Sequence, residues 1–243
     1  MVRLQQTERA IYTNVILEQI MSLSKNQYYP RIAIGHMDYE GTPYHEVILS
    51  ARHQLGLLHE SLRDIFKYVQ PDICQQDVFS HQIRNLILLA ATEFEAQCIG
   101  ILEANDVMSQ GRYFNTNDYV RLNPVLKLDQ YTCRLAMFPA YPPVSPFGGW
   151  DPSNPTTSLN WYDAYNKTKH NRESEFSHAS LHNAIQAVAA CTSIYFAQTL
   201  TWDMNPENLG FPNSFRYESS PAFGKSELYS FGVGPKIEVP YPF

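Results

Sequence analysis

Apolar residues return every three or four positions in two long stretches of the first half of the chain, which is the spacing of an amphipathic helix. In the first stretch these positions are Ile48, Ala51, Leu55, Leu58, Leu62, Ile65 and Val69. In the second stretch, which follows the suitable N-cap Ser80, they are Ile83, Ile87, Ala90, Phe94, Cys98 and Ile101. We therefore predict two helices, over residues 46–69 and 81–105, that pack antiparallel.

Two further helices are predicted in the second half of the chain. One covers residues 158–169 and, if it continues to His170, carries a stripe that can face a core: Trp161, Ala164, Tyr165 and Thr168. The other covers residues 178–199, with Ser177 as its cap and the apolar positions Leu181, Ile185, Val188, Ala189, Thr192 and Phe196. Four such helices predict a mainly α protein, a bundle with minor β elements.

The segment between the second and third helices has a different pattern. Residues 119–128 form a short apolar element, and residues 131–137 are aromatic and β-branched enough for a short strand. Residues 139–155 then contain six prolines and two glycines, which predicts a long loop, here called the proline-rich segment. Connections of that length are often lids or binding surfaces.

The two ends of the chain are predicted to lie outside the bundle. Residues 1–45 offer a helix over 7–24 and an edge strand over 31–34. Residues 204–243 are rich in proline and aromatic side chains, so we expect an extended tail packed on the bundle. The expected organisation is thus an N-terminal segment, a bundle over residues 46–203 and the tail.

Composition narrows the functional classes. With 243 residues, 44% of them hydrophobic, the chain can bury one sizeable core, and its net charge of −6 argues against a surface that coats nucleic acid. The chain begins without an apolar signal region and has no run of about 18 apolar residues, so we expect a soluble, cytoplasmic protein without a membrane partner. The four cysteines are widely spaced and form no C-x-x-C pair, which favours buried, reduced thiols.

The candidate chemistry is concentrated where the third helix ends. Asn166, Lys167, Lys169 and His170 gather at its last turn, and Arg172 follows. Lysine and arginine bind phosphate and an imidazole can transfer a proton, so this cluster can hold and cleave a phosphodiester. The alternative is purely structural, because cations at a helix C-terminus also stabilise the helix dipole.

Two other features of the sequence bear on metals and cofactors. His178 and His182 have the i, i+4 spacing that can place two imidazoles on one metal, but no carboxylate completes a ligand set, so we predict no metal. The sequence also lacks a glycine-rich phosphate loop and a G-x-S-x-G elbow, and we expect no cofactor.

Charged residues on the second helix have two readings each. Glu93 and Glu95 interrupt an otherwise apolar helix centre; one of them could turn inward to orient Arg172 or His170, or both could face solvent. Arg84 could add charge to the same end of the bundle, or it could be an ordinary surface arginine.

The order of these elements resembles the HEPN superfamily over roughly residues 46–200. The resemblance is carried by the helix that begins Arg84-Asn-Leu-Ile, a variable insert, the segment Trp161-Tyr-Asp-Ala-Tyr-Asn-Lys-Thr-Lys-His-Asn-Arg172 and the alanine-rich last helix. It implies a small helical bundle, commonly a homodimer, and in many members a metal-independent ribonuclease of a toxin–antitoxin or phage-defence system. The implied partners are RNA and an antitoxin or another defence protein.

The active motif of that family is an arginine followed about four to six residues later by a histidine, often with a polar residue after the arginine. Arg172 and His178 fit this spacing, with Glu173 as the polar residue. In the other register His170 is the histidine, and Tyr165 stands where the arginine belongs. We favour His170 because it lies in the dense basic cluster.

The resemblance then implies a division of roles. His170 is the general acid or base, Arg172 and Lys169 stabilise charge on the phosphate, and Asn166 orients the phosphate or the imidazole. The remaining residues expected to contact the substrate are Lys167, Tyr165, His178 and Glu93.

Two functions from other classes compete with the nuclease. The first is a non-catalytic HEPN-like module that dimerises or binds a partner protein. The second is a small-ligand sensor that uses the aromatic residues around Phe147-Gly-Gly-Trp150 in the proline-rich segment.

Overall fold

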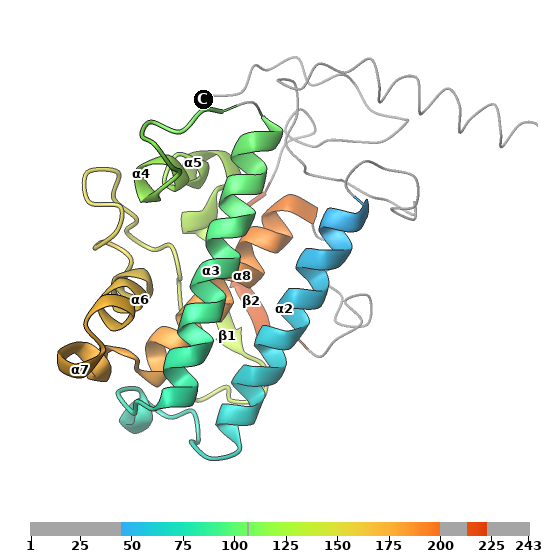
Figure 1. Ribbon diagram of the computed structural model, residues 1–243. Helices are drawn as coiled ribbons and strands as arrows, with labels where there is room; N and C mark the ends of the chain where they lie inside the picture. The colour runs from blue at the N-terminus through green and yellow to red at the C-terminus, as the bar shows by residue number, and fades with distance from the viewer. Residues whose placement is uncertain (1–44, 106, 200–212, 223–243) are drawn as a thin grey trace, which may run out of the picture.

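The computed structural model describes residues 45–105, 107–199 and 213–222 (Figure 1). The helix expected over residues 7–24, the strand expected over 31–34 and most of the expected tail lie outside these ranges.

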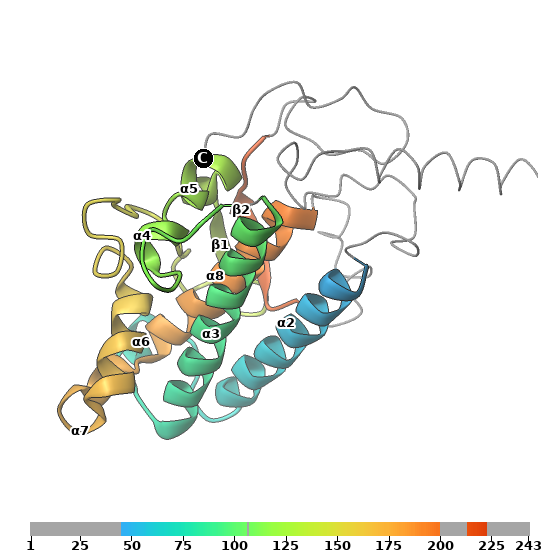
Figure 2. The same cartoon turned by 45° about the horizontal axis from the view of Figure 1, so that its top comes forward.

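The described part of the chain is mainly helical, as predicted. Its long helices are α2 (His45–Phe66), α3 (His81–Ala104), α6 (Asn160–His170) and α8 (Leu181–Thr199). Helix α3 contacts all of the other three, and α8 also contacts α2 and α6. Figures 1 and 2 show α2 and α3 running in opposite directions, with α8 behind them and α6 on the far side of α3.

The first two predicted helices are confirmed, because their apolar stripes face the core. Leu55, Leu58 and Leu62 of α2 are buried, although the helix ends at Phe66, three residues before the predicted end. In α3 every residue of the predicted stripe, from Ile83 to Ile101, is buried. The Ser80 side chain accepts a hydrogen bond from the backbone N–H of Ile83 at 3.2 Å, which confirms the cap.

The last helix starts later than predicted. Its cap is Ser180, whose side chain accepts from the N–H of Asn183 at 3.3 Å, and His178 lies before the helix in the 3₁₀ turn Phe176–His178. The reason is a contact with the segment that precedes α3. Leu181 donates its backbone N–H to Val78 at 2.8 Å, and Ser180 pairs with Phe79 as an isolated β-bridge, so the chain cannot be helical there.

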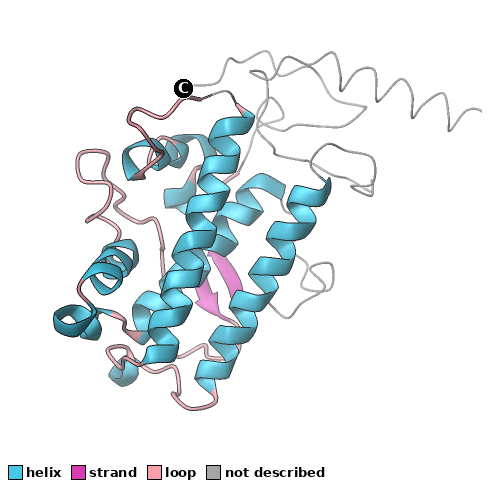
Figure 3. Cartoon of the chain, in the orientation of Figure 1, coloured by secondary structure: helices cyan, strands magenta, loops and turns pink. Residues whose placement is uncertain are grey.

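Between α3 and α6 the chain forms small elements. The apolar stretch 119–128 contributes to two short helices, α4 (Thr116–Tyr119) and α5 (Leu122–Leu126), instead of one element. The predicted strand is confirmed as β1 (Thr132–Leu135). It pairs antiparallel with β2 (Phe215–Ser219), a strand within the region expected to be an extended tail (Figure 3).

The proline-rich segment is a loop, but its aromatic side chains belong to the core. Phe147 is fully buried and Trp150 is 4% exposed, and both rings pack on Phe94 of α3, with centroids 5.8 and 6.0 Å away. The indole N–H of Trp150 donates to the carbonyl of Pro155 at 2.9 Å. The two aromatic side chains around which a ligand site was expected are therefore used for packing.

A buried histidine joins α2 and α8 to the segment before β2. The Nδ1 atom of His59 accepts from the backbone N–H of Ser214 at 3.1 Å, so Nε2 carries the proton and donates to the Thr192 hydroxyl, also at 3.1 Å. Thr192 in turn donates to the carbonyl of Val188 at 2.7 Å. Burial, with the nearby charge of Arg63, lowers the pKa of His59 to about 3.

We predict that His59 makes the fold sensitive to mild acid. The unfolded chain protonates this imidazole below its ordinary pKa of 6.5, whereas the folded chain does so near a pKa of about 3, so its stabilisation is complete above pH 6.5 and is lost as the pH falls towards 3. Between about pH 7.5 and about pH 5 the free energy of unfolding should fall by about 2 kcal/mol from this group.

Urea unfolding across this pH range measures the effect. His59→Gln, which does not titrate, should be less stable at neutral pH but should have a flatter pH dependence. His53→Gln changes an exposed histidine of the same helix and should keep the wild-type slope. Equal slopes for wild type and His59→Gln would contradict the prediction.

Candidate functional site

Helix α6 is buried along one face and exposed at its end. The predicted stripe is confirmed, since Trp161, Ala164, Tyr165 and Thr168 are all buried. Trp161 also donates its indole N–H to the carbonyl of Pro146 at 2.9 Å, which ties the helix to the proline-rich segment. The stripe does not include Lys169 and His170, and both remain exposed where the helix ends.

Arg84 joins the start of α3 to the end of α6. Its Nε and Nη2 atoms donate to the carbonyl oxygen of Thr168 at 3.1 and 2.9 Å. Carbonyl groups in the last turn of a helix have no partner within the helix, and the guanidinium supplies one. Arg84 is therefore not an ordinary surface arginine, and its contact brings the charge of α3 to the basic end of α6.

A wide surface pocket of about 550 Å³ lies at this junction. We call it the basic pocket; its lining residues are Arg84, Lys169, His170, Asn171, Arg172, Glu173 and Ser174. Residues 169–174 are contiguous in the sequence. They reach the pocket together because α6 ends at His170 and the single turn α7 (Arg172–Glu175) starts directly after Asn171. Three permanent cations thus share the pocket with one imidazole and one carboxylate.

Lys169 is held in place by a tyrosine. Its ammonium donates to the Tyr165 hydroxyl at 2.8 Å and lies 4.8 Å from the centroid of the same ring. This hydrogen bond is the main cause of a raised pKa for Lys169, so the side chain stays charged at neutral pH. Tyr165 itself is buried and does not line the pocket, so the structure places it beneath Lys169 and not among the pocket residues.

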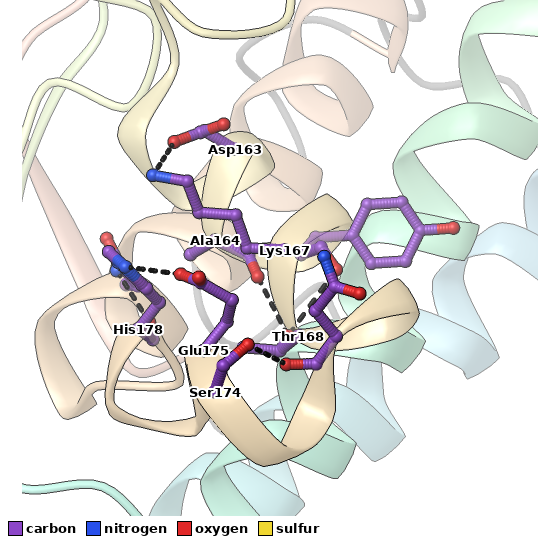
Figure 4. A network of polar contacts seen from close by, with 10 residues as sticks. Asp163, Ala164, Lys167, Thr168, Ser174, Glu175 and His178 are labelled. Carbon is purple, nitrogen blue, oxygen red and sulfur yellow. Dashed lines mark hydrogen bonds and ion pairs between the residues drawn. The ribbon is translucent and has the colours of Figure 1, made fainter.

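Two further side chains of α6 turn away from the pocket. Asn166 donates its amide to the carbonyl of Tyr162 at 3.1 Å, one turn back in its own helix. Lys167 forms an ion pair with Asp163 at 2.8 Å, and this contact raises the pKa of Lys167 (Figure 4). Neither side chain lines the basic pocket, so the structure does not bring Asn166 or Lys167 together with Lys169, His170 and Arg172 there.

Glu93 and Glu95 of α3 also have partners of their own. Glu93 accepts from Gln97 at 2.8 Å, and its partial burial raises its pKa. Glu95 accepts a short hydrogen bond, 2.5 Å, from the Tyr162 hydroxyl. Neither carboxylate lines the pocket, and these hydrogen bonds are made to Gln97 and Tyr162 instead of Arg172 or His170.

His178 lies outside the pocket as well. Its Nε2 atom is 3.0 Å from a carboxylate oxygen of Glu175, as Figure 4 shows, so the register that pairs Arg172 with His178 brings only the arginine to the pocket. His182 instead shares a hydrogen bond of 2.9 Å with the Tyr141 hydroxyl, and burial lowers its pKa. Within residues 45–105, 107–199 and 213–222, no three His, Cys, Asp or Glu side chains form a group suited to a metal.

The structure adds two pocket residues that had no predicted role, Asn171 and Ser174, and it also brings Glu173, the polar residue after Arg172, to the pocket lining. Only their position in the sequence could have indicated the first two, because they lie directly between the basic end of α6 and the 3₁₀ turn. The sequence indicates Arg84 either as a charge at this end of the bundle or as an ordinary surface arginine, and it gives no sign of the contact with Thr168.

No family model, curated protein or solved structure matches this chain. Among the described helices, α3 is long and apolar enough over His81–Glu103 to span a membrane by length and composition. Three helices pack around it here, as around the core helix of a bundle.

We predict that Arg84→Ala destabilises the fold by about 1–2 kcal/mol, because it removes two charge-assisted hydrogen bonds and leaves the Thr168 carbonyl without these donors. Arg84→Lys should recover part of the loss, since lysine cannot form the forked pair. Denaturant unfolding measures both, and Arg216→Ala, at an exposed position of β2, is the matched control. A loss no larger than that of the control would contradict the role of this contact.

Proposed function

We propose that the basic pocket binds a phosphodiester of RNA and that the protein is a metal-independent endoribonuclease of a toxin–antitoxin or phage-defence system. The observation that carries the proposal is the convergence of Arg84, Lys169 and Arg172 on one pocket that also exposes His170. The resemblance to HEPN proteins supports the reaction class.

Local charge supports an anionic ligand although the chain is acidic overall. The net charge is −6, yet the pocket holds three permanent cations against the single carboxylate of Glu173. Arg84 uses two of its five N–H donors on Thr168, so donors remain for a phosphate. Clustered cations in a recess concentrate anions locally, whatever the net charge of the protein.

The proposed reaction needs one proton acceptor and cations that stabilise the negative charge on the phosphate. Neutral His170 takes the proton of an RNA 2′-hydroxyl, the 2′-oxygen attacks the adjacent phosphorus, and the bond to the 5′-oxygen breaks. The leaving oxygen takes a proton from solvent, giving a 2′,3′-cyclic phosphate and a 5′-hydroxyl. Arg172 and Lys169 stabilise the negative charge that grows on the phosphate oxygens.

A second candidate is a non-catalytic module that dimerises or binds a partner such as an antitoxin. It is favoured by apolar side chains exposed along one side of α2 and α3, with Leu57 43% and Leu89 51% exposed. A groove of about 540 Å³ between the two helices, lined by Ile65, Tyr68 and Leu89 among others, lies on the same side. The engagement of Asn166 within its own helix also favours this candidate.

We predict that purified protein cleaves RNA in the presence of EDTA and that His170→Ala lowers the rate by roughly 10²- to 10⁴-fold, because it removes the general acid or base. End-group analysis should find 2′,3′-cyclic phosphate and 5′-hydroxyl ends. His53→Ala removes an exposed histidine of α2 and should leave the rate unchanged. If wild type and His170→Ala are folded and equally inactive, the catalytic proposal fails and the binding module takes its place.

We also predict that Arg172→Ala weakens RNA binding and flattens its dependence on salt. Each phosphate contact releases counterions, so losing one should reduce the slope of log affinity against log salt by about 0.7 for a single strand. Fluorescence anisotropy at several salt concentrations measures this slope, with Arg216→Ala as the control. An unchanged slope would remove Arg172 from the phosphate contacts.

A further inference from the structure

A group of aromatic side chains lies beside the basic pocket without a role in the chemistry above. Phe79 is 48% exposed, and His81 is also exposed. Both contact the half-buried ring of Phe176, with ring centroids 5.4 Å apart for Phe79 and 4.7 Å for His81. We call these three residues the aromatic platform.

The backbone that carries the platform is fixed. Phe79 pairs with Ser180 in a β-bridge. Between the same two segments, the backbone N–H of His182 donates to the carbonyl of Gln76 at 2.9 Å. The cap Ser80 starts α3 directly after Phe79. The rings are therefore displayed by rigid elements, and no ordering of a loop is required before they can bind a planar group.

The aromatic platform and the basic pocket lie close together because two segments, the start of α3 and the segment around α7, each contribute residues to both. His81 and Arg84 are three residues apart on α3, so their side chains lie on the same helix face. Arg172 is the first residue of the single turn α7, and Phe176 follows directly after its last residue, Glu175. Figures 1 and 2 place α7 and the start of α3 at the same end of the molecule.

We infer that the pocket takes single-stranded RNA, with one nucleobase stacked on Phe79 and His81 while the adjoining phosphate binds the cations. This inference rests on the proposed function. A cationic groove beside accessible aromatic rings is the combination that binds single strands, because every base offers a flat face and every linkage a charge. In a duplex the bases are already stacked on one another and cannot reach the rings.

The test measures the contribution of the nucleobases to binding separately from that of the sugar–phosphate backbone. One probe is a fluorescent 2′-O-methylated oligoadenylate of about eight nucleotides, which resists cleavage because its 2′-oxygen is blocked. The second is an abasic ribose-phosphate oligomer of the same length. Phe79→Ala should weaken binding of the oligoadenylate roughly 5- to 150-fold and leave binding of the abasic oligomer unchanged. Phe79→Trp should keep wild-type affinity, since the flat surface is retained.

Tyr113→Ala is the matched control, because it removes a 70% exposed aromatic ring beyond the other end of α3. It should change neither affinity. Equal effects of Phe79→Ala on both probes, or none on either, would overturn the stacking role and leave the nuclease intact. Equal affinity for a duplex of the same length would overturn the preference for single strands. If wild type binds neither probe, the proposed function itself fails and this inference with it.

Discussion

The position of the basic pocket depends on one contact, the pair of hydrogen bonds from Arg84 to the carbonyl of Thr168. The end of a helix has carbonyls without partners, and a guanidinium that satisfies one of them fixes that end in space. Because the chain continues from there into His170 and α7, the pocket residues are positioned relative to α3 by this contact. Arg84 is both the anchor of α6 and one of the charges it helps to assemble.

Much of the fold could be predicted from the spacing of apolar residues. The long helices follow from it because α2, α3 and α6 each bury one face, and α8 keeps apolar residues at helical spacing although it is buried on every side over residues 187–197. Strand β1 follows from its β-branched and aromatic content. The start of α8 could not be predicted, since Ser177 and Ser180 are equally good caps and a β-bridge to Phe79 decides between them. The burial of Phe147 was also missed, because a proline-rich composition predicts a loop without predicting where its rings go.

The part of the site that could be predicted is the part whose residues are close together in the sequence. Lys169, His170 and Arg172 meet because they adjoin the end of one helix. Asn166 was misassigned because a side chain near a helix end can bond to a carbonyl one turn back, and sequence spacing does not reveal which partner it takes. The contribution of Arg84 and the lack of one from Glu93 both depend on the packing of α3 against α6, which periodicity alone does not describe.

The proline-rich segment has the composition of a loop but the packing of a core element. The indole N–H groups of Trp150 and Trp161 both bond to carbonyls within it, those of Pro155 and Pro146. A residue gained or lost between these carbonyls would shift one ring relative to the other and leave a buried donor without its acceptor. Surface loops ordinarily absorb changes in length during evolution. In this chain, that freedom must lie in other connections, so new binding surfaces would arise elsewhere than in the longest irregular segment of the part that the structure describes.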